Sequence, residues 1–263
     1  MKIQFSLAQM DIKFGNIEDN FHTATSFIKQ AAKAQSEFII FPELWTTGYD
    51  LQSATKFADQ IDRGIFKKIE RLSHIYQINI GGSILEVEGN HIFNTFTLHN
   101  PDHGLINTYR KTHLFRPMSE HLYLTAGNTY STVSYPWGNM GVCICYDLRF
   151  PEIFRKYAEM DCEIILICAE WPAERIHHWR TLLQARAIEN QIYIVAVNRV
   201  GNDPNITYGG NSCIINPDGQ EIIHGNMDQE LLTAEIDLDT IKLYREKFNI
   251  LQDRRLDLDL YSR

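Results

Sequence analysis

Hydrophobic and polar positions along the chain follow two periods, which predict a regular succession of strands and helices. Residues 19–34 carry apolar or small side chains at three- and four-residue spacing, the pattern of one helix face. Residues 38–41 and 163–168 are short, continuous apolar runs, which are typical of buried strands. The other expected strands are residues 3–9, 79–83, 91–98, 105–109, 140–144, 192–197, 212–216 and 231–236, and the other expected helices are residues 66–76, 151–160 and 178–190.

The helical patterns also indicate which side chains face the core. In the helix predicted at residues 66–76, Ile75 belongs to the apolar face. In the helix predicted at residues 178–190, Trp179 points inward and Ile188 is a further candidate.

No linker, charge block or low-complexity segment separates the two halves of the chain. Many strands covered by amphipathic helices therefore predict one α/β domain over residues 1–263. Residues 242–263 are charged and helical to irregular, so we expect this C-terminal segment to pack on the core or on a partner subunit.

Composition and charge narrow the class of protein. With 44% hydrophobic residues the chain can bury a substantial core, and a formal charge of −8 argues against nucleic acid or an anionic membrane as a partner. The sequence starts directly in a strand-like pattern, and no apolar stretch approaches the roughly 18–20 residues that span a membrane. Five cysteines without a CxxC pair are typical of a reducing compartment and make a structural zinc site improbable. We expect a cytoplasmic protein.

Three reactive side chains follow predicted strands directly. Glu43 comes after residues 38–41, Lys111 after residues 105–109, and Cys145 after residues 140–144. Ligands of α/β proteins bind in the crevice beyond the carboxyl ends of the strands, so these three side chains are candidates for one site. Trp171 and the pair Asn198-Arg199 follow two further strands and are expected at the same rim.

The cysteine stands at a junction that changes character abruptly. The apolar run stops at Cys145, and Pro151 is expected to open a helix, since proline suits the first helical position. A thiol at such a strand-to-helix junction is expected to lie in a field that favours the thiolate.

Each candidate also has an ordinary structural role. A cysteine in an apolar run is usually a core residue, and the strand pattern alone does not separate Cys145 from Cys143. Glu43 could be a solvated loop acid, and Lys111 could be a surface charge. The pair of cysteines is a weak indication of a metal site, because only one residue separates them and no histidine supports them.

Three motifs together resemble the nitrilase superfamily of carbon–nitrogen hydrolases. They are residues 41–43 (FPE), 109–115 (YRKTHLF) and 145–152 (CYDLRFPE), and they occur in the family's order. The resemblance is strongest to the bacterial ω-amidase branch, through residues 115–116 (FR), 119–121 (SEH), 125–128 (TAGN), 171–173 (WPA), 178–183 (HWRTLL), 185–191 (ARAIENQ) and 244–248 (YREKF). It implies a four-layer α-β-β-α sandwich that forms a homodimer through helices.

The resemblance also implies roles for individual residues. Cys145 would be the nucleophile, Glu43 the general base and Lys111 the stabiliser of charge. Glu120 is similar to the second glutamate of the superfamily, which positions the lysine and the substrate amide. The backbone N–H of Tyr146 would join Lys111 in binding the oxyanion. No metal or organic cofactor is called for.

For the ω-amidase branch, the implied substrates are short α-keto acid amides such as 2-oxoglutaramate and 2-oxosuccinamate. Such a substrate carries a carboxylate, which an arginine can bind with two hydrogen bonds. Arg175 and Arg116 are the candidates, with Arg175 preferred. Phe115 and Trp171 would form the apolar walls.

Two alternatives remain open from the sequence. The same three catalytic residues could act, with water, on another small amide, an N-carbamoyl compound, deaminated glutathione or a nitrile. A catalytically silent binding or assembly module would keep the fold without the reaction.

Overall fold

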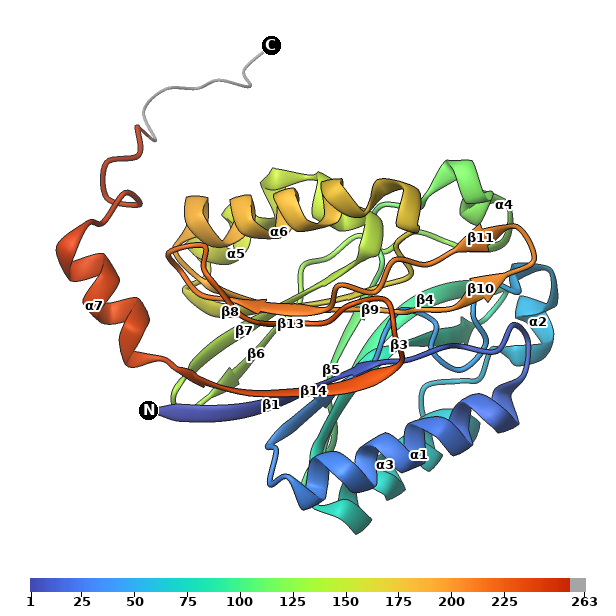
Figure 1. The fold of residues 1–263 in the computed structure, drawn as a ribbon. Helices are drawn as coiled ribbons and strands as arrows, with labels where there is room; N and C mark the ends of the chain where they lie inside the picture. The colour runs from blue at the N-terminus through green and yellow to red at the C-terminus, as the bar shows by residue number, and fades with distance from the viewer. Residues whose placement is uncertain (256–263) are drawn as a thin grey trace.

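The computed structural model describes residues 1–255 as two stacked β-sheets between two pairs of helices (Figure 1). The helices are α1 (Ile17–Lys33), α2 (Ala54–Phe57), α3 (Gly64–Tyr76), α4 (Glu120–Tyr123), α5 (Pro151–Glu159), α6 (Ile176–Asn190) and α7 (Asp239–Lys247). The strands are β1 (Lys2–Gln9), β2 (Phe38–Ile40), β3 (Asn79–Glu88), β4 (His91–Asn100), β5 (Gly104–Arg110), β6 (Thr132–Tyr135), β7 (Gly138–Ile144), β8 (Cys162–Ala169), β9 (Tyr193–Asn198), β10 (Asn202–Asp203), β11 (Ile206–Thr207), β12 (Cys213–Ile215), β13 (Glu221–His224) and β14 (Glu230–Asp237).

Each main sheet has six strands and the same internal plan. The first runs in the order β14-β1-β2-β3-β4-β5 and the second in the order β13-β12-β9-β8-β7-β6. In each, three parallel strands form the centre. One strand is added antiparallel on one side, and an antiparallel hairpin of two strands on the other. The two halves of the chain are thus alike in topology, although no repeat is visible in the residues.

The core between the sheets is built by the alternation of side chains along each strand. Phe5 and Phe38 of the first sheet and Leu166 and Val195 of the second belong to one buried apolar cluster. Helices α1 and α3 cover the outer face of the first sheet, and α5 and α6 cover that of the second (Figure 1). The four-layer α-β-β-α sandwich expected from the sequence is confirmed.

Strand direction explains why the candidate side chains meet. Strand β5 is antiparallel to β4, which is antiparallel to β3, so β5 runs in the same direction as β2 and β3. The residues that follow β2 and β5 therefore leave the first sheet at one edge. In the second sheet β7, β8 and β9 are parallel, so the residues that follow them also share one edge.

The structure corrects several expectations about elements. Ile75 is 54% exposed and Ile188 is 42% exposed, so neither faces the core. In α3 the buried face runs through Ile69 and Ser73, and Ile75 is two residues, about 200°, further round the helix. Strands β6 and β13 were not predicted, because short edge strands have a weak hydrophobic pattern.

The junction after β7 also differs from the expectation. The chain does not pass straight into α5, because a 3₁₀ turn over Cys145–Arg149 comes first. The thiol therefore lies at the start of this short turn and not at the N-terminus of α5.

The C-terminal segment packs against the ends of α5 and α6. Gln191 and Arg245 join α7 and the end of α6, since Arg245 donates to the Gln191 carbonyl at 3.1 Å and the Gln191 side chain donates to the Phe248 carbonyl. Arg254 forms an ion pair with Glu159 at 2.6 Å. The last part of the predicted segment, residues 256–263, lies outside the described residues. In the part of the chain that is described, no helix is long and apolar enough to cross a membrane.

Candidate active site

The three reactive side chains predicted from strand ends come together inside the protein. Glu43 follows β2 by three residues, and Lys111 and Cys145 directly follow β5 and β7. Glu43 is fully buried, and Lys111 and Cys145 are 1% and 6% exposed. Glu43 is therefore no solvated loop acid and Lys111 no surface charge. Cys143 is a core residue, with no exposed surface.

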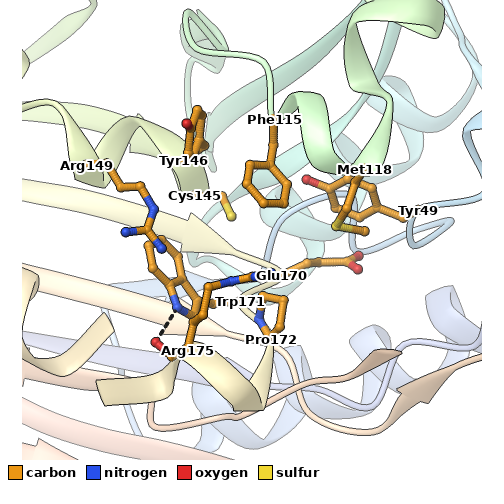
Figure 2. A pocket seen from close by; sticks show the side chains of 10 residues that line it. All are labelled: Tyr49, Phe115, Met118, Cys145, Tyr146, Arg149, Glu170, Trp171, Pro172 and Arg175. Atoms are coloured by element: carbon orange, nitrogen blue, oxygen red, sulfur yellow. Dashed lines mark hydrogen bonds between the residues drawn. The ribbon is translucent and has the colours of Figure 1, made fainter. Parts of the chain in front are cut away.

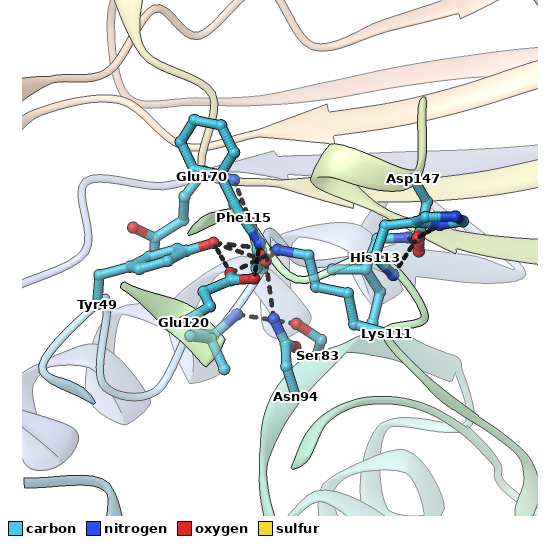
Figure 3. A network of polar contacts seen from close by, with 12 residues as sticks. Tyr49, Ser83, Asn94, Lys111, His113, Phe115, Glu120, Asp147 and Glu170 are labelled. Atoms are coloured by element: carbon cyan, nitrogen blue, oxygen red, sulfur yellow. Dashed lines mark hydrogen bonds and ion pairs between the residues drawn. The ribbon is translucent and has the colours of Figure 1, made fainter. Parts of the chain in front are cut away.

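A buried ammonium group with two carboxylates forms the centre of the site (Figure 3). Lys111 Nζ lies 2.7 Å from Glu43 Oε1 and also forms an ion pair with Glu120 Oε1. Burial by itself lowers the pKa of Lys111, but the charges of Glu120 and Glu43 outweigh it and hold this pKa well above its ordinary value. Lys111 thus stays positively charged.

Glu43 is surrounded by further hydrogen-bond donors. Its Oε1 accepts from Asn94 Nδ2 at 2.7 Å and from the Tyr49 hydroxyl at 2.9 Å, and its Oε2 accepts from the backbone N–H of Glu170 at 3.0 Å. These donors fix the orientation of the carboxylate and stabilise its negative charge.

Tyr49 is a member of the site that sequence reasoning missed. Its hydroxyl contacts both Glu43 and Glu120, and it lies 3.3 Å from Lys111 Nζ. Burial and the two carboxylates raise its pKa well above the ordinary value, so the hydroxyl keeps its proton. No motif marks this residue, which reaches the site through the fold of the loop after Glu43.

Glu120 is held as firmly as Glu43. It is the first residue of α4 and is fully buried, and its Oε2 accepts a hydrogen bond from the backbone N–H of Phe115. One oxygen is thereby fixed by the backbone, and the other contacts Lys111 and Tyr49.

Cys145 has an unusual backbone conformation. Its φ is 46°, in the left-handed region that residues with a Cβ seldom adopt, so the turn holds the nucleophile candidate in a strained position. Such strain is common at functional sites.

The electrostatics at the thiol differ from the sequence expectation. Burial raises the pKa of Cys145 well above its ordinary value, and so do the charge of Glu43 and a hydrogen bond with it, while Lys111 acts in the opposite direction. The expectation of a field that favours the thiolate is wrong for the free enzyme. The resting state is a protonated thiol beside a carboxylate that can accept its proton.

A buried carboxylate joins the two loops that carry Cys145 and Lys111. Asp147 is fully buried and accepts hydrogen bonds from both loops. Figure 3 shows it beside His113. Its donors are the backbone N–H of Ile144 at 3.0 Å, the backbone N–H of His113 at 3.0 Å, the Thr112 hydroxyl at 3.0 Å and the Tyr109 hydroxyl at 2.8 Å. This network fixes the distance between the two loops.

A small pocket opens onto the Cys145 sulfur (Figure 2). The empty space between its lining residues, including the part open to solvent, is about 280 Å³. Of the substrate-binding residues predicted from the sequence, Phe115, Trp171 and Arg175 line it, and Tyr146 lies in its wall. Arg116 is exposed and does not belong to the lining.

Further residues of the wall were not singled out from the sequence. Arg149, Met118 and Glu170 line the pocket. Asn198 was expected at the rim. Its Oδ1 accepts from the backbone N–H of Trp171 at 2.6 Å and its Nδ2 donates to the Trp171 carbonyl at 3.1 Å, so it fixes this part of the wall.

Metal ligands are not grouped in the described structure. Among residues 1–255, no set of three or more His, Cys, Asp or Glu side chains is arranged to hold a metal ion.

Comparisons with known proteins show which sequences and structures the chain is similar to. A sequence model of the carbon–nitrogen hydrolase family matches residues 5–246. The chain is 36% identical to the 2-oxoglutaramate amidase of Bacillus subtilis over 259 residues, which cover 98% of this chain and 100% of that protein. It is 37% identical to the ω-amidase YafV of Escherichia coli K12 over 82% of this chain and 84% of that protein. A solved structure of a CN-hydrolase superfamily protein from Xanthomonas campestris, with an arsenic adduct in its active site, superposes with a TM-score of 0.91 at 30% identity and covers 97% of this chain and 98% of that one.

Proposed function

The chain belongs to the carbon–nitrogen hydrolase family, and from this premise we propose that it is a cysteine-dependent ω-amidase. It would hydrolyse the terminal amide of short 2-oxo acids such as 2-oxoglutaramate and 2-oxosuccinamate to the acid and ammonia. The observation that carries the proposal is the Cys145 thiol, which lines a small pocket and feels the charges of the buried Glu43–Lys111 pair.

The first half of the reaction forms an acyl-enzyme. The Cys145 sulfur attacks the amide carbon while its proton passes to Glu43, and a C–S bond forms. Glu43 then gives this proton to the amide nitrogen, the C–N bond breaks and ammonia leaves. Because the pKa of the resting thiol is raised, the thiol keeps its proton until Glu43 accepts it.

The second half hydrolyses the thioester. Glu43 takes a proton from water, the resulting hydroxide attacks the carbonyl carbon, and the proton returns to the departing sulfur. Lys111 and the backbone N–H of Tyr146 would stabilise the negative oxygen in both halves, and each such donor is worth roughly 10²–10³ in rate. Glu120 would hold Lys111 and the substrate amide in position.

The size of the pocket favours short substrates. The empty space between its lining residues is only about 280 Å³, even with the part open to solvent included. An amide of four or five carbons suits it better than deaminated glutathione. Arg175, on the pocket wall, would pair with the substrate carboxylate.

We also propose that the enzyme is a cytoplasmic homodimer, which rests on the resemblance to its family. An analytical ultracentrifugation run on the purified protein measures the mass directly. A monomer that is fully active would contradict the proposed dimer.

Ammonia release from a panel of substrates tests the proposed function. The panel contains 2-oxoglutaramate, 2-oxosuccinamate, an N-carbamoyl amine, deaminated glutathione and a simple nitrile at equal concentration. We expect the two 2-oxo acid amides to have the highest kcat/KM and EDTA to leave the rate unchanged. A nitrile or carbamoyl compound as best substrate would overturn the substrate assignment.

Two cysteine variants separate the nucleophile from a core thiol on the same strand. Cys145→Ala is expected to lose at least roughly 10⁴-fold in kcat, since removal of a nucleophile leaves only binding and oxyanion stabilisation. Cys143→Ala, the matched control, removes a buried thiol of β7 and is expected to keep the rate of folded enzyme. Equal activity in Cys145→Ala and the unmodified enzyme would exclude the proposed mechanism.

A further inference from the structure

One cation of the pocket wall has no acidic partner among the residues that the structure describes. Arg149 is the last residue of the 3₁₀ turn that begins with Cys145, so the turn fixes its position relative to the sulfur. Among residues 1–255, no carboxylate forms an ion pair with its guanidinium. Within the same residues, its one polar side-chain contact is long, 3.4 Å to His178 Nδ1.

The guanidinium is held over an aromatic ring that also lines the pocket. Its central carbon lies 4.7 Å from the centroid of the Trp171 ring. The Trp171 Nε1 donates at 2.9 Å to the backbone carbonyl of Arg175, whose own guanidinium lies 5.6 Å from the Phe115 ring. Figure 2 shows Arg149 and Arg175 beside Trp171, around the opening that leads to the Cys145 sulfur. Stacking on an aromatic face orients an arginine and leaves its N–H groups free for a ligand.

The charges of the pocket wall do not balance. Its one carboxylate among the described residues is Glu170, and Glu170 Oε2 is paired at 2.9 Å with Arg199, which does not line the pocket. Arg175 has a partner, Glu174 at 2.7 Å, but the Glu174 side chain is 68% exposed, and such surface pairs are weak. The wall therefore presents two guanidinium groups without an internal counter-charge.

The environment of Arg149 makes this charge costly in the free enzyme. Burial lowers the pKa of Arg149, and the positive charge of Arg175 acts in the same direction, while Tyr146 and Cys145 act against it. A negatively charged ligand between the two guanidinium groups would relieve both effects.

We propose that Arg149, together with Arg175, binds the carboxylate of the substrate and selects anionic amides over neutral ones. The proposal rests on the proposed amidase function and extends it. Arg116, the alternative considered from the sequence, is exposed and outside the pocket lining. Because Arg149 and Cys145 belong to one turn, the carboxylate would be bound at a fixed distance from the attacked carbon, and short linear amides would be selected by length as well as charge.

Steady-state kinetics on two amides of equal length test the selection. The substrates are 2-oxoglutaramate and the neutral pentanamide, and the variants are Arg149→Met, Arg149→Lys and the matched control Arg71→Met, whose exposed arginine lies on α3. For Arg149→Met we expect kcat/KM for 2-oxoglutaramate to fall roughly tenfold to hundredfold, mainly through KM, as for a lost hydrogen bond to a charged group. Arg149→Lys should lose less, the loss on pentanamide should be much smaller than the loss on 2-oxoglutaramate, and Arg71→Met should not change. An equal loss on both amides would overturn the proposal.

Binding of the product separates this proposal from the proposed function. Titration calorimetry with 2-oxoglutarate is expected to give a Kd at least tenfold weaker for Arg149→Met than for the unmodified enzyme, with Arg149→Lys as a second, conservative variant if Arg149→Met folds poorly. An unchanged Kd in both variants, or no binding to the unmodified enzyme, overturns the role of Arg149. If no 2-oxo acid amide releases ammonia, the proposed function fails, and the ratio of Kd values still decides on Arg149.

Discussion

Two buried clusters in this protein contain almost the same set of side chains. The lysine cluster consists of Lys111, Glu43, Glu120 and Tyr49, and the arginine cluster consists of Arg199, Glu170, Asp203 and Tyr208. Each has one cation, two carboxyl groups and one tyrosine hydroxyl. They even touch, because the backbone N–H of Glu170 donates to Glu43.

The clusters differ in how their carboxyl groups are held. Glu43 accepts from the side chains of Lys111, Asn94 and Tyr49 and from one backbone N–H. Glu170 has Arg199 at one oxygen, and its Oε1 has no hydrogen-bond partner among the described residues. Burial raises the pKa of Glu170 to about 8, against the effect of Arg199, so it holds a proton at neutral pH. The arginine cluster is then balanced, with one positive and one negative charge.

The difference shows what a buried ionic cluster needs for chemistry. In the lysine cluster the donors stabilise a carboxylate next to a thiol, and the thiol faces a pocket. In the arginine cluster the guanidinium group of Arg199 stabilises the fold, because it also donates to the backbone carbonyls of Ile12 and Val200. We therefore expect substitutions in the first cluster to change the rate and those in the second to change stability.

Glu43→Gln should give the largest effect. It should lower the activity and leave the stability of the fold unchanged. The amide keeps the size of the side chain but cannot accept the thiol proton, so kcat should fall roughly 10²–10⁴-fold. Lys111 keeps Glu120 as a partner, so the unfolding midpoint should stay close to that of the unmodified protein. Ammonia release and thermal unfolding, measured on the same preparation, check both parts. More than a tenth of the original rate would contradict the role of Glu43 as base.

Arg199→Met should give the opposite result. It leaves the buried Asp203 without its cation, and breaking a buried pair in this way costs roughly 3–5 kcal/mol of unfolding free energy. Urea unfolding measures the loss, with Arg63→Met as the matched control, because the pair of Arg63 with Asp62 is exposed and worth roughly 0–1 kcal/mol. The rate per folded molecule at low temperature should be kept. A rate loss as large as that of Glu43→Gln, at unchanged stability, would remove the distinction between the clusters.

Most site residues that could be predicted from the sequence were candidates because they directly follow a predicted strand. Glu43, Lys111 and Cys145 follow apolar runs, and the parallel directions of β2, β5 and β7 within their sheets bring such positions to shared edges. Position along a strand can be read from the hydrophobic pattern, which made these three residues candidates without any contact information. The choice of Cys145 over Cys143 also needed the resemblance of residues 145–152 to the family motif.

The residues that were missed or misplaced depend on loop conformation. Tyr49 reaches Glu43 because the intervening loop turns back at Leu44, whose φ is 41°, and no hydrophobic period encodes that turn. Arg116 and Arg149 are both in recognisable motifs, but which one faces the pocket depends on the 3₁₀ turns that contain them. Patterns of hydrophobic residues predict elements, and the direction of a loop side chain needs the full set of tertiary contacts.

Glu170→Gln should give the smallest effect, one that depends on pH. The pKa of Glu170 is raised in the folded protein from 4.5 to about 8, so from about pH 4.5 to about pH 8 the unfolded chain has released a proton that the folded chain still holds. In that interval stability falls as pH rises, because the folded state binds more protons. The stabilising contribution is complete below the unfolded pKa and is lost as pH rises through the folded pKa.

The glutamine side chain does not titrate, so the unfolding free energies of the two proteins should depend differently on pH. The unfolding free energy of the unmodified protein should decline relative to that of Glu170→Gln between pH 6 and pH 8, by at most about 3 kcal/mol. Urea unfolding of both proteins at four pH values across this interval measures the difference. A difference that stays constant with pH would mean that Glu170 is already ionised in the folded protein. The arginine cluster would then carry an extra negative charge, and protonation of Glu170 could no longer account for its charge balance.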